Sequence, residues 1–196
     1  MATPTWITLA NSNQYNQANA GTAVSNFTTA TDVSPGTNVT GQAFQTSPAQ
    51  LYPGQMWRFT ANGIWSSTAS PGVSLGIYYG GAAGSPICYA SVGPGSAQAN
   101  AASIPWYLTA MGKLTAVGAS VGSWQVIGTL TGLYNPSGTG AALGGYGTSL
   151  MPVYTSAAQY DTSTARLITL AATCSAASTS NAMTVYNWAI EYMTEP

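Results

Sequence analysis

The sequence predicts an all-β protein: an antiparallel β-sandwich, jelly-roll-like, formed by a single domain with an extended N-terminal arm. Three observations lead to this prediction. Short runs of alternating apolar and polar residues, rich in β-branched and aromatic side chains, recur along the chain. Clusters of Gly, Pro, Ser and Asn separate them. No segment has an apolar stripe of 3.6-residue period and helical length, and repeated strands without intervening helices form sandwiches or barrels.

The first two expected strands are residues 27–33 and 55–66. The first ends at the Ser-Pro-Gly sequence of residues 34–36, which is a turn signal because proline presets φ and glycine accepts a positive φ. The second alternates regularly between apolar and polar side chains. Gly63 is expected to form a β-bulge in it that shifts the alternation near its end.

The middle of the chain contains four expected strands, at residues 73–79, 87–92, 104–117 and 124–130. In each of them every second side chain is apolar, so one face of the strand is expected to lie in the core. Glycine or proline residues bound these segments.

The last three expected strands are residues 153–156, 164–174 and 183–193. The final segment comes closest to a helical pattern. Because its aromatic and aliphatic residues also alternate from Tyr186 to Tyr192, we expect it to be the closing strand.

Residues 1–22 are expected to form an extended arm, outside a β-sandwich domain of residues 23–196. Residues 11–17 have neither helical nor strand periodicity, whereas aromatic and aliphatic residues nearby offer apolar anchors. The arm is either a frayed terminus or a segment that docks on a neighbouring subunit. Its candidate capsid or subunit contacts are Trp6, Ile7, Leu9 and Tyr15.

Residues 132–149 form the longest expected loop, and loops of this length in compact domains are usually functional or mobile. Tyr134 and Tyr146 are candidate contact residues on it, although exposed tyrosines in a flexible loop are the commoner case. A second group of aromatic residues has two interpretations. Its members either form a platform on which glycans stack, or they pack in the core and at a subunit interface. Its members are Tyr78, Tyr79, Tyr89, Trp106 and Tyr107.

Charged residues make up only 4% of the chain, against about 25% in a typical soluble domain. The formal net charge of -1 provides almost no self-repulsion, so the surface is expected to associate with itself or with a partner. Nucleic acid is excluded as a partner because phosphate binding needs clustered Lys and Arg. No apolar run approaches the ~20 residues of a membrane helix, and the N-terminus lacks a signal-peptide pattern.

Two cysteines, Cys88 and Cys174, lie in strand-like segments. We expect two small buried side chains in a protein made in a reducing compartment, with a disulfide left open as an alternative. The chain has no histidine, which removes Ser-His and Cys-His nucleophiles and most transition-metal sites. No phosphate-binding loop with its lysine occurs either.

The four carboxylates do not suggest a catalytic pair. Asp32 and Asp161 occur in turn sequences, where we expect them to cap backbone N–H groups, with Arg166 as an ion partner of Asp161. Glu191 is expected on the outward side of the last strand, and Glu195 lies near the terminus. The sequence therefore predicts a protein that is not an enzyme and that holds no metal or cofactor.

Several strand and turn segments are similar to virion proteins of tailed bacteriophages, notably those that infect actinobacteria. The similarity covers about residues 28–192, and its motifs carry no catalytic signature. The segments are TTATDVSPG (28–36), GQMWRFTANG (54–63), VSLGIYYGG (73–81), IPWYL (104–108) and LAATCSAAS (170–178). The resemblance implies a jelly-roll-like minor structural or capsid decoration protein, a homotrimer on the capsid surface. It transfers no functional residue.

The expected function is therefore that of a capsid decoration or stabilising protein, bound to the major capsid protein as a homo-oligomer. The expected location is the virion, after synthesis in the host bacterial cytoplasm. The alternative is a tail-tip or fibre module that binds host-surface glycans. A glycosidase is the least favoured hypothesis, because the carboxylates are scattered.

Overall fold

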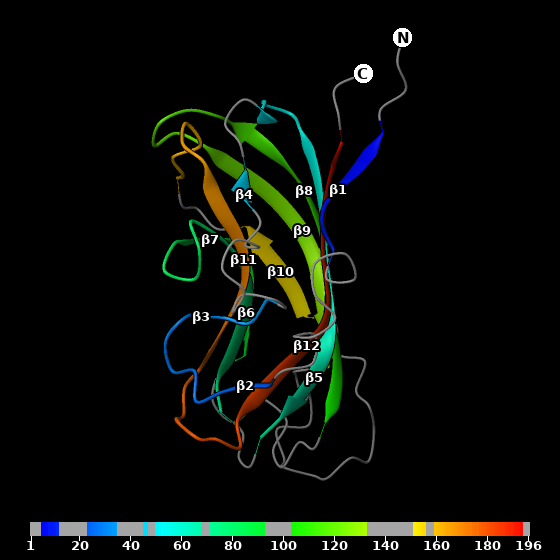
Figure 1. Cartoon of the computed structure of the whole chain (residues 1–196), viewed down its shortest axis with the longest axis vertical. Helices are drawn as coiled ribbons and strands as arrows, with labels where there is room; N and C mark the ends of the chain where they lie inside the picture. Colours follow the sequence, from blue (N-terminus) through cyan, green and yellow to red (C-terminus); the bar gives the residue numbers. More distant parts are fainter. Residues whose placement is uncertain are drawn as a thin grey trace.

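The computed structural model describes residues 5–11, 23–34, 45–46, 50–67, 71–92, 103–132, 151–155 and 159–193. They form two antiparallel sheets packed against each other, which is an antiparallel β-sandwich (Figure 1). The all-β prediction is confirmed, whereas the jelly-roll arrangement stays a prediction. The described part of the chain contains no helix long and apolar enough to cross a membrane.

Twelve strands build the sandwich. Their bounds are β1 Trp6–Asn11, β2 Ala23–Ser25, β3 Thr31–Asp32, β4 Gln45–Thr46, β5 Met56–Ser66, β6 Val73–Tyr79, β7 Ser85–Val92, β8 Ile104–Ala116, β9 Ser123–Thr131, β10 Met151–Thr155, β11 Arg166–Cys174 and β12 Ala182–Met193.

The first sheet, called the β5 sheet here, has the order β1-β12-β5-β8-β9, and β2 also pairs with β12. The second, the β6 sheet, has the order β7-β6-β11-β3, and β4 also pairs with β11. Strand β10 joins them, because its first residues pair with β9 and its last two pair with β7. The two layers are therefore continuous along this side of the sandwich.

Eight of the nine expected strands are confirmed, from β5 to β12. The expected strand at 27–33 is wrong over most of its length, since only β3 lies within it. This segment is anchored at two separate points of β11: the Cys174 N–H donates to the Phe27 carbonyl, and the Val33 N–H donates to the Leu170 carbonyl. Buried side chains at Phe27 and Val33 thus produce a strand-like pattern without a continuous ladder.

Aromatic side chains fill much of the space between the two sheets. Trp57 and Trp124 of the β5 sheet meet edge to face at 5.2 Å between ring centroids, and Tyr79 of the β6 sheet lies 6.4 Å from Trp124. The larger fully buried side chains are Trp57, Trp65, Phe27, Phe59, Leu75, Ile77, Ile87, Leu108, Leu114, Leu130 and Ile168.

The β-bulge lies in β12, not at Gly63 of β5, so that prediction is wrong. Strand β5 alternates without a break, and its pairing with β8 is continuous through Gly63. On the other side of β5, the register with β12 shifts between Val185 and Asn187. Tyr186 is the extra residue, and it points outward while Trp188 lies in the core. The closing strand therefore does not alternate evenly from Tyr186 onward.

The close approach of β12 explains the glycine. A Cβ at Gly63 would lie 1.8 Å from the Thr184 carbonyl oxygen and 2.9 Å from Cζ2 of Trp106. Only a residue without a side chain lets the β12 backbone and the Trp106 ring come this near.

Both cysteines are buried, as expected, and both are free. Burial raises the pKa of the Cys88 thiol to about 12. A thiol that stays protonated at neutral pH is a poor nucleophile, so Cys88 is a packing residue.

Replacing Gly63 with alanine is expected to lower the free energy of unfolding by about 3 kcal/mol or more, because the new methyl group overlaps the β12 backbone. Chemical denaturation measures the change. Thr60→Ala, on the outward side of the same strand, is the matched control and should cost much less. A Gly63→Ala variant as stable as the control would contradict this account of the glycine.

Candidate functional site

The side chains that β5, β8, β9 and β12 point away from the core form one continuous surface, called the outer face here. Strict alternation produces it, because long strands whose even or odd positions are buried present the others to solvent. Its residues are Arg58, Thr60, Asn62 and Ile64 of β5; Pro105, Tyr107, Thr109, Met111 and Lys113 of β8; Gln125, Ile127, Thr129 and Thr131 of β9; and Tyr186, Asn187 and Glu191 of β12.

Exposed apolar side chains gather on this face. Six large apolar or aromatic side chains of the described residues are exposed, and four of them lie here: Tyr107 at 45%, Met111 at 41%, Ile127 at 76% and Tyr186 at 43%. Single exposed apolar residues are ordinary on protein surfaces, whereas several on one face indicate an interaction site.

The most exposed of these, Ile127, lies directly opposite Met111. Met111 is in turn opposite Arg58, so one row crosses from β9 through β8 to β5. The next row contains Thr60, Thr109 and Thr129. The apolar pair therefore has a row of hydroxyl groups on one side and a row that contains Lys113 and Gln125 on the other.

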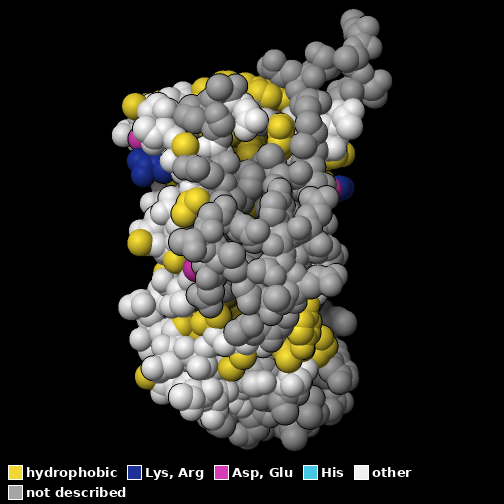
Figure 2. Space-filling model, in the orientation of Figure 1, with side chains coloured by type: hydrophobic (Ala, Val, Ile, Leu, Met, Phe, Trp, Pro, Cys, Tyr) yellow, Lys and Arg dark blue, Asp and Glu magenta, His cyan; other side chains and the backbone are white. Residues whose placement is uncertain are grey.

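The charges of the outer face are few and mostly paired. Arg58 Nε lies 2.6 Å from Glu191 Oε2, and the hydrogen bond from this guanidinium to Glu191 raises the pKa of Arg58. The Arg58 guanidinium also lies 4.7 Å from the centre of the Trp6 ring. Lys113 is the remaining charged side chain of the face. In Figure 2, which views the sandwich from the side, the described residues likewise have charged side chains only in a few small spots.

A neutral polar area adjoins the apolar residues. Asn62 lies opposite Tyr107 of β8 on one side and Asn187 of β12 on the other. The Asn187 side-chain amide donates to the Asn62 Oδ1 over 3.2 Å. The bulge places Tyr186 next to Asn187, so two exposed tyrosines flank the two amides.

The predicted arm contacts are distributed between described and undescribed parts of the chain. Trp6 opens β1 and lies half-buried against Arg58 of the same chain. Ile7 is opposite Tyr192 of β12, and Leu9 falls where the β1–β12 register shifts. Tyr15 lies outside the described residues, as do the two candidate loop contacts, Tyr134 and Tyr146.

The five aromatic residues of the suggested platform are not brought together. Tyr79 and Trp106 are buried in the core, and Tyr78 is half-buried. Tyr89 and Tyr107 are both exposed, but Tyr89 belongs to the β6 sheet and Tyr107 to the β5 sheet. The structure instead groups Tyr107 with Tyr186, Met111 and Ile127. Sequence reasoning passed over the last two, although the alternation that buries Trp124 and Val126 also turns Ile127 outward.

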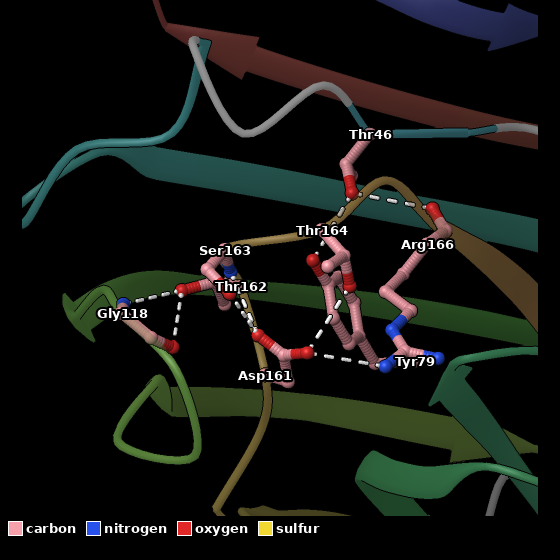
Figure 3. A network of polar contacts seen from close by, with 8 residues as sticks. All are labelled: Thr46, Tyr79, Gly118, Asp161, Thr162, Ser163, Thr164 and Arg166. Carbon is pink, nitrogen blue, oxygen red and sulfur yellow. Dashed lines mark hydrogen bonds and ion pairs between the residues drawn. The ribbon is translucent and has the colours of Figure 1, made fainter.

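Two carboxylates cap turns, as expected. The Ser34 N–H donates to Asp32 Oδ1 at 2.8 Å, and the Ser163 N–H donates to Asp161 Oδ1 at 3.0 Å. The expected ion pair also forms, with Arg166 Nη2 3.2 Å from Asp161 Oδ2. Figure 3 shows the Asp161 carboxylate directed at Thr164 and Arg166, each donating to it.

The neighbouring Thr162 ties this turn to the turn between β8 and β9. The Gly118 N–H donates to Thr162 Oγ1 at 2.7 Å, and the Thr162 hydroxyl donates to the Gly118 carbonyl at 3.3 Å (Figure 3). The Thr162 N–H also donates to the Gly118 carbonyl, at 3.1 Å. Hydrogen bonds from Ser163 lower the pKa of Asp161 to about 2, with smaller contributions from Arg166 and Thr164. A carboxylate that stays ionised and is held by four donor groups is suited to fastening a turn rather than to proton transfer.

Within the described ranges, no group of three or more Cys, Asp or Glu side chains is placed to hold a metal ion. The described acidic side chains serve as caps or ion partners in the fold: Asp32, Asp161 and Glu191. The outer face is therefore the candidate functional site, and what it offers is a contact surface.

The Asp161 and Asp32 caps should respond to pH in opposite directions. Asp161 has a folded pKa of about 2, below its ordinary value, so its contribution to stability is present above about pH 4 and disappears as the pH falls towards 2. The melting-temperature difference between wild type and Asp161→Asn should shrink over that range. Burial raises the pKa of Asp32, so its ionised form is disfavoured in the fold. The melting temperature of Asp32→Asn should therefore rise relative to wild type as the pH increases, and parallel responses of the two variants would contradict both assignments.

In comparisons with known proteins, no family model matches this chain, and no curated protein or solved structure is significantly similar to it. The functional interpretation of the outer face therefore rests on its own residues.

Proposed function

We propose that the chain is a non-catalytic structural protein of a bacteriophage virion, a capsid decoration or stabilising protein that binds the outer shell as a homo-oligomer. The observation that carries the proposal is the outer face of the β5 sheet, an extended surface that has four exposed apolar or aromatic side chains and whose charged groups are the Arg58–Glu191 pair and Lys113. The choice of partner, the major capsid protein, follows from the expected resemblance of several segments to virion proteins, for which the comparisons found no counterpart.

The composition of the outer face fits a protein interface. The buried centres of such interfaces are depleted in charged residues and enriched in Tyr, Met and Arg. The face has Met111 opposite Ile127, Tyr107 and Tyr186 farther along the same surface, and Arg58 paired with Glu191. Packing against another surface would remove Ile127 from water, and the Arg58–Glu191 pair would enter the contact already neutralised.

The scarcity of charge supports the same proposal. Soluble monomers usually carry about 25% charged residues, which keep them apart, and this chain has 4%. A surface of hydroxyl, amide and apolar groups costs less to desolvate on a second copy than a charged surface, provided that its polar groups form hydrogen bonds across the contact. A homotrimer is the assembly that we propose for it.

Ile127→Asp is expected to weaken assembly at least ~100-fold, because it would bury an unpaired carboxylate at the centre of the contact. Analytical ultracentrifugation of the purified protein measures self-association, and co-sedimentation with capsids of the major capsid protein measures attachment. The wild-type side chain is mostly in water, so the melting temperature of the variant should hardly change.

Tyr89→Asp is the matched control, because Tyr89 is also exposed but lies on the β6 sheet. It should leave both self-association and attachment unchanged. If Ile127→Asp assembles and attaches as tightly as wild type, the outer face is not the assembly surface.

A second candidate function, binding of neutral glycans, is favoured by one observation. Tyr107 and Tyr186 lie two strands apart on the outer face, about 10 Å at the usual strand spacing, with the Asn62 and Asn187 amides between them. Aromatic rings beside hydrogen-bonding amides suit sugar rings, which have apolar faces and hydroxyl edges.

A glycan array on the purified protein distinguishes the two functions. If the tyrosine pair binds sugars, Tyr107→Ala should reduce the affinity for the bound glycan at least ~10-fold, whereas Tyr89→Ala should not change it. Saturable binding that Tyr107→Ala abolishes would favour the glycan function, and an empty array would remove it.

A further inference from the structure

Strand β1 is attached to the rest of the described structure along a single edge. It pairs antiparallel with β12, from Trp6 opposite Met193 to Asn11 opposite Ala189. It is the outermost strand of the β5 sheet, and its described partner on the ladder is β12. In Figure 1, β1 lies beside the end of β12, near both chain termini. A strand held in this way can leave without breaking any other pairing of the sheet.

Two other strands of the sheet form the contact site for Trp6, the first residue of β1. Glu191 of β12 holds Arg58 of β5 at 2.6 Å, and the Trp6 ring lies over the guanidinium at 4.7 Å. Arg58 and Glu191 belong to the two adjacent strands and contact each other directly. The contact site for Trp6 therefore consists of residues outside β1, and it would bind the Trp6 of any copy.

The connection from β1 to β2 is much longer than the gap that it spans. Both strands pair with the same edge of β12, since β5 occupies the other edge. Asn11 lies opposite Ala189 and Ala23 opposite Thr184, five residues apart, which is roughly 17 Å along a strand. The twelve residue steps from 11 to 23 can extend to about 40 Å. The connection thus reaches more than twice as far as its closed position requires.

Charge does not oppose placing this segment on another copy. The first charged side chain of the sequence is Asp32, so residues 1–31 carry none. Pairing with β12 of a neighbour would form the same backbone hydrogen bonds and the same Trp6–Arg58 contact. When an element makes identical contacts in either arrangement, exchange between copies costs little.

We propose that β1 is an exchangeable strand: in the assembled protein, β1 of one copy adds to β12 of a neighbouring copy, with its Trp6 on the neighbour's Arg58. This inference rests on the self-assembly part of the proposed function and adds the segment that links the copies. It gives the predicted arm a specific binding site in a second copy, which is the edge of β12 between residues 189 and 193.

Disulfide trapping between two single variants tests the exchange. Asn11→Cys and Ala189→Cys are co-expressed in differently tagged full-length chains, so a disulfide between positions 11 and 189 can form only between copies. Directly opposite residues of antiparallel strands have Cα atoms about 4.5–5.5 Å apart, which a disulfide can bridge. The native Cys88 and Cys174 are buried and should not compete.

The matched control uses Ser74→Cys and Thr173→Cys, which are opposite each other on β6 and β11. Co-expressed as single variants, they should give no link between copies, because these strands stay in one chain. Combined in one chain, they should give an intrachain link that shows complete oxidation. Non-reducing gels and mass spectrometry of the linked peptides identify the products, and ultracentrifugation gives the oligomeric state.

Exchange predicts that about half or more of the co-expressed chains carry the link between positions 11 and 189, while the 74–173 control carries none. No such link between copies overturns the exchange. If the unlinked protein still sediments as an oligomer, self-assembly stands and proceeds through another surface. If it sediments as a monomer, self-assembly fails together with the exchange.

Discussion

The packing of the sandwich depends on the contact between Trp57 and Trp124, because this contact links the aromatic side chains of the β5 sheet to those of the β6 sheet. Trp57 also lies against Tyr192 of β12, at 5.5 Å between ring centroids. Trp124 extends the cluster to Tyr79 of the β6 sheet, and Tyr79 meets Tyr160 edge to face at 5.7 Å. One aromatic chain therefore runs from the closing strand, through both sheets, to the turn that Asp161 caps. With so few ion pairs in the chain, large rings supply the cohesion that charged networks cannot.

The same alternation that builds this core creates the candidate functional site. In β5, every residue that points into the core on the side of Trp57 is followed by one that points outward. Because this alternation is unbroken, all the outward side chains of β5 lie on the outer face. Gly63 preserves that phase, because it lets β12 come close while the register irregularity falls at Tyr186. The close packing of β12 on Gly63, the bulge beside it and the exposure of Tyr186 therefore occur together at one place in the sheet.

Periodicity was sufficient to predict the all-β class and eight strands, and the turn sequences predicted the caps of Asp32 and Asp161 and the Arg166 ion pair. It failed where a residue's position depends on a partner far away in sequence. Phe27 and Val33 are buried by contacts with β11, and no local pattern distinguishes them from strand residues. A β-bulge does lie opposite Gly63, but its extra residue, Tyr186, belongs to the partner strand β12. Trp6 was expected to be an anchor, whereas its contact with Arg58 depends on pairing between the two ends of the chain. The exposure of Ile127 follows from the alternation of β9, in which Trp124 and Val126 point into the core.

The positions of the three basic residues have a consequence for resistance to proteases. Trypsin-like proteases cut after Lys or Arg and need an extended, locally unfolded segment. Arg58, Lys113 and Arg166 all lie within strands, in β5, β8 and β11, and every connection between strands lacks both residue types. Arg58 and Lys113 lie in the interior of long strands, so cleavage after them requires a strand of the sandwich to open, whereas Arg166 is the first residue of β11 and is half exposed. Resistance to digestion in this protein is a direct measure of how rarely its sheets come apart.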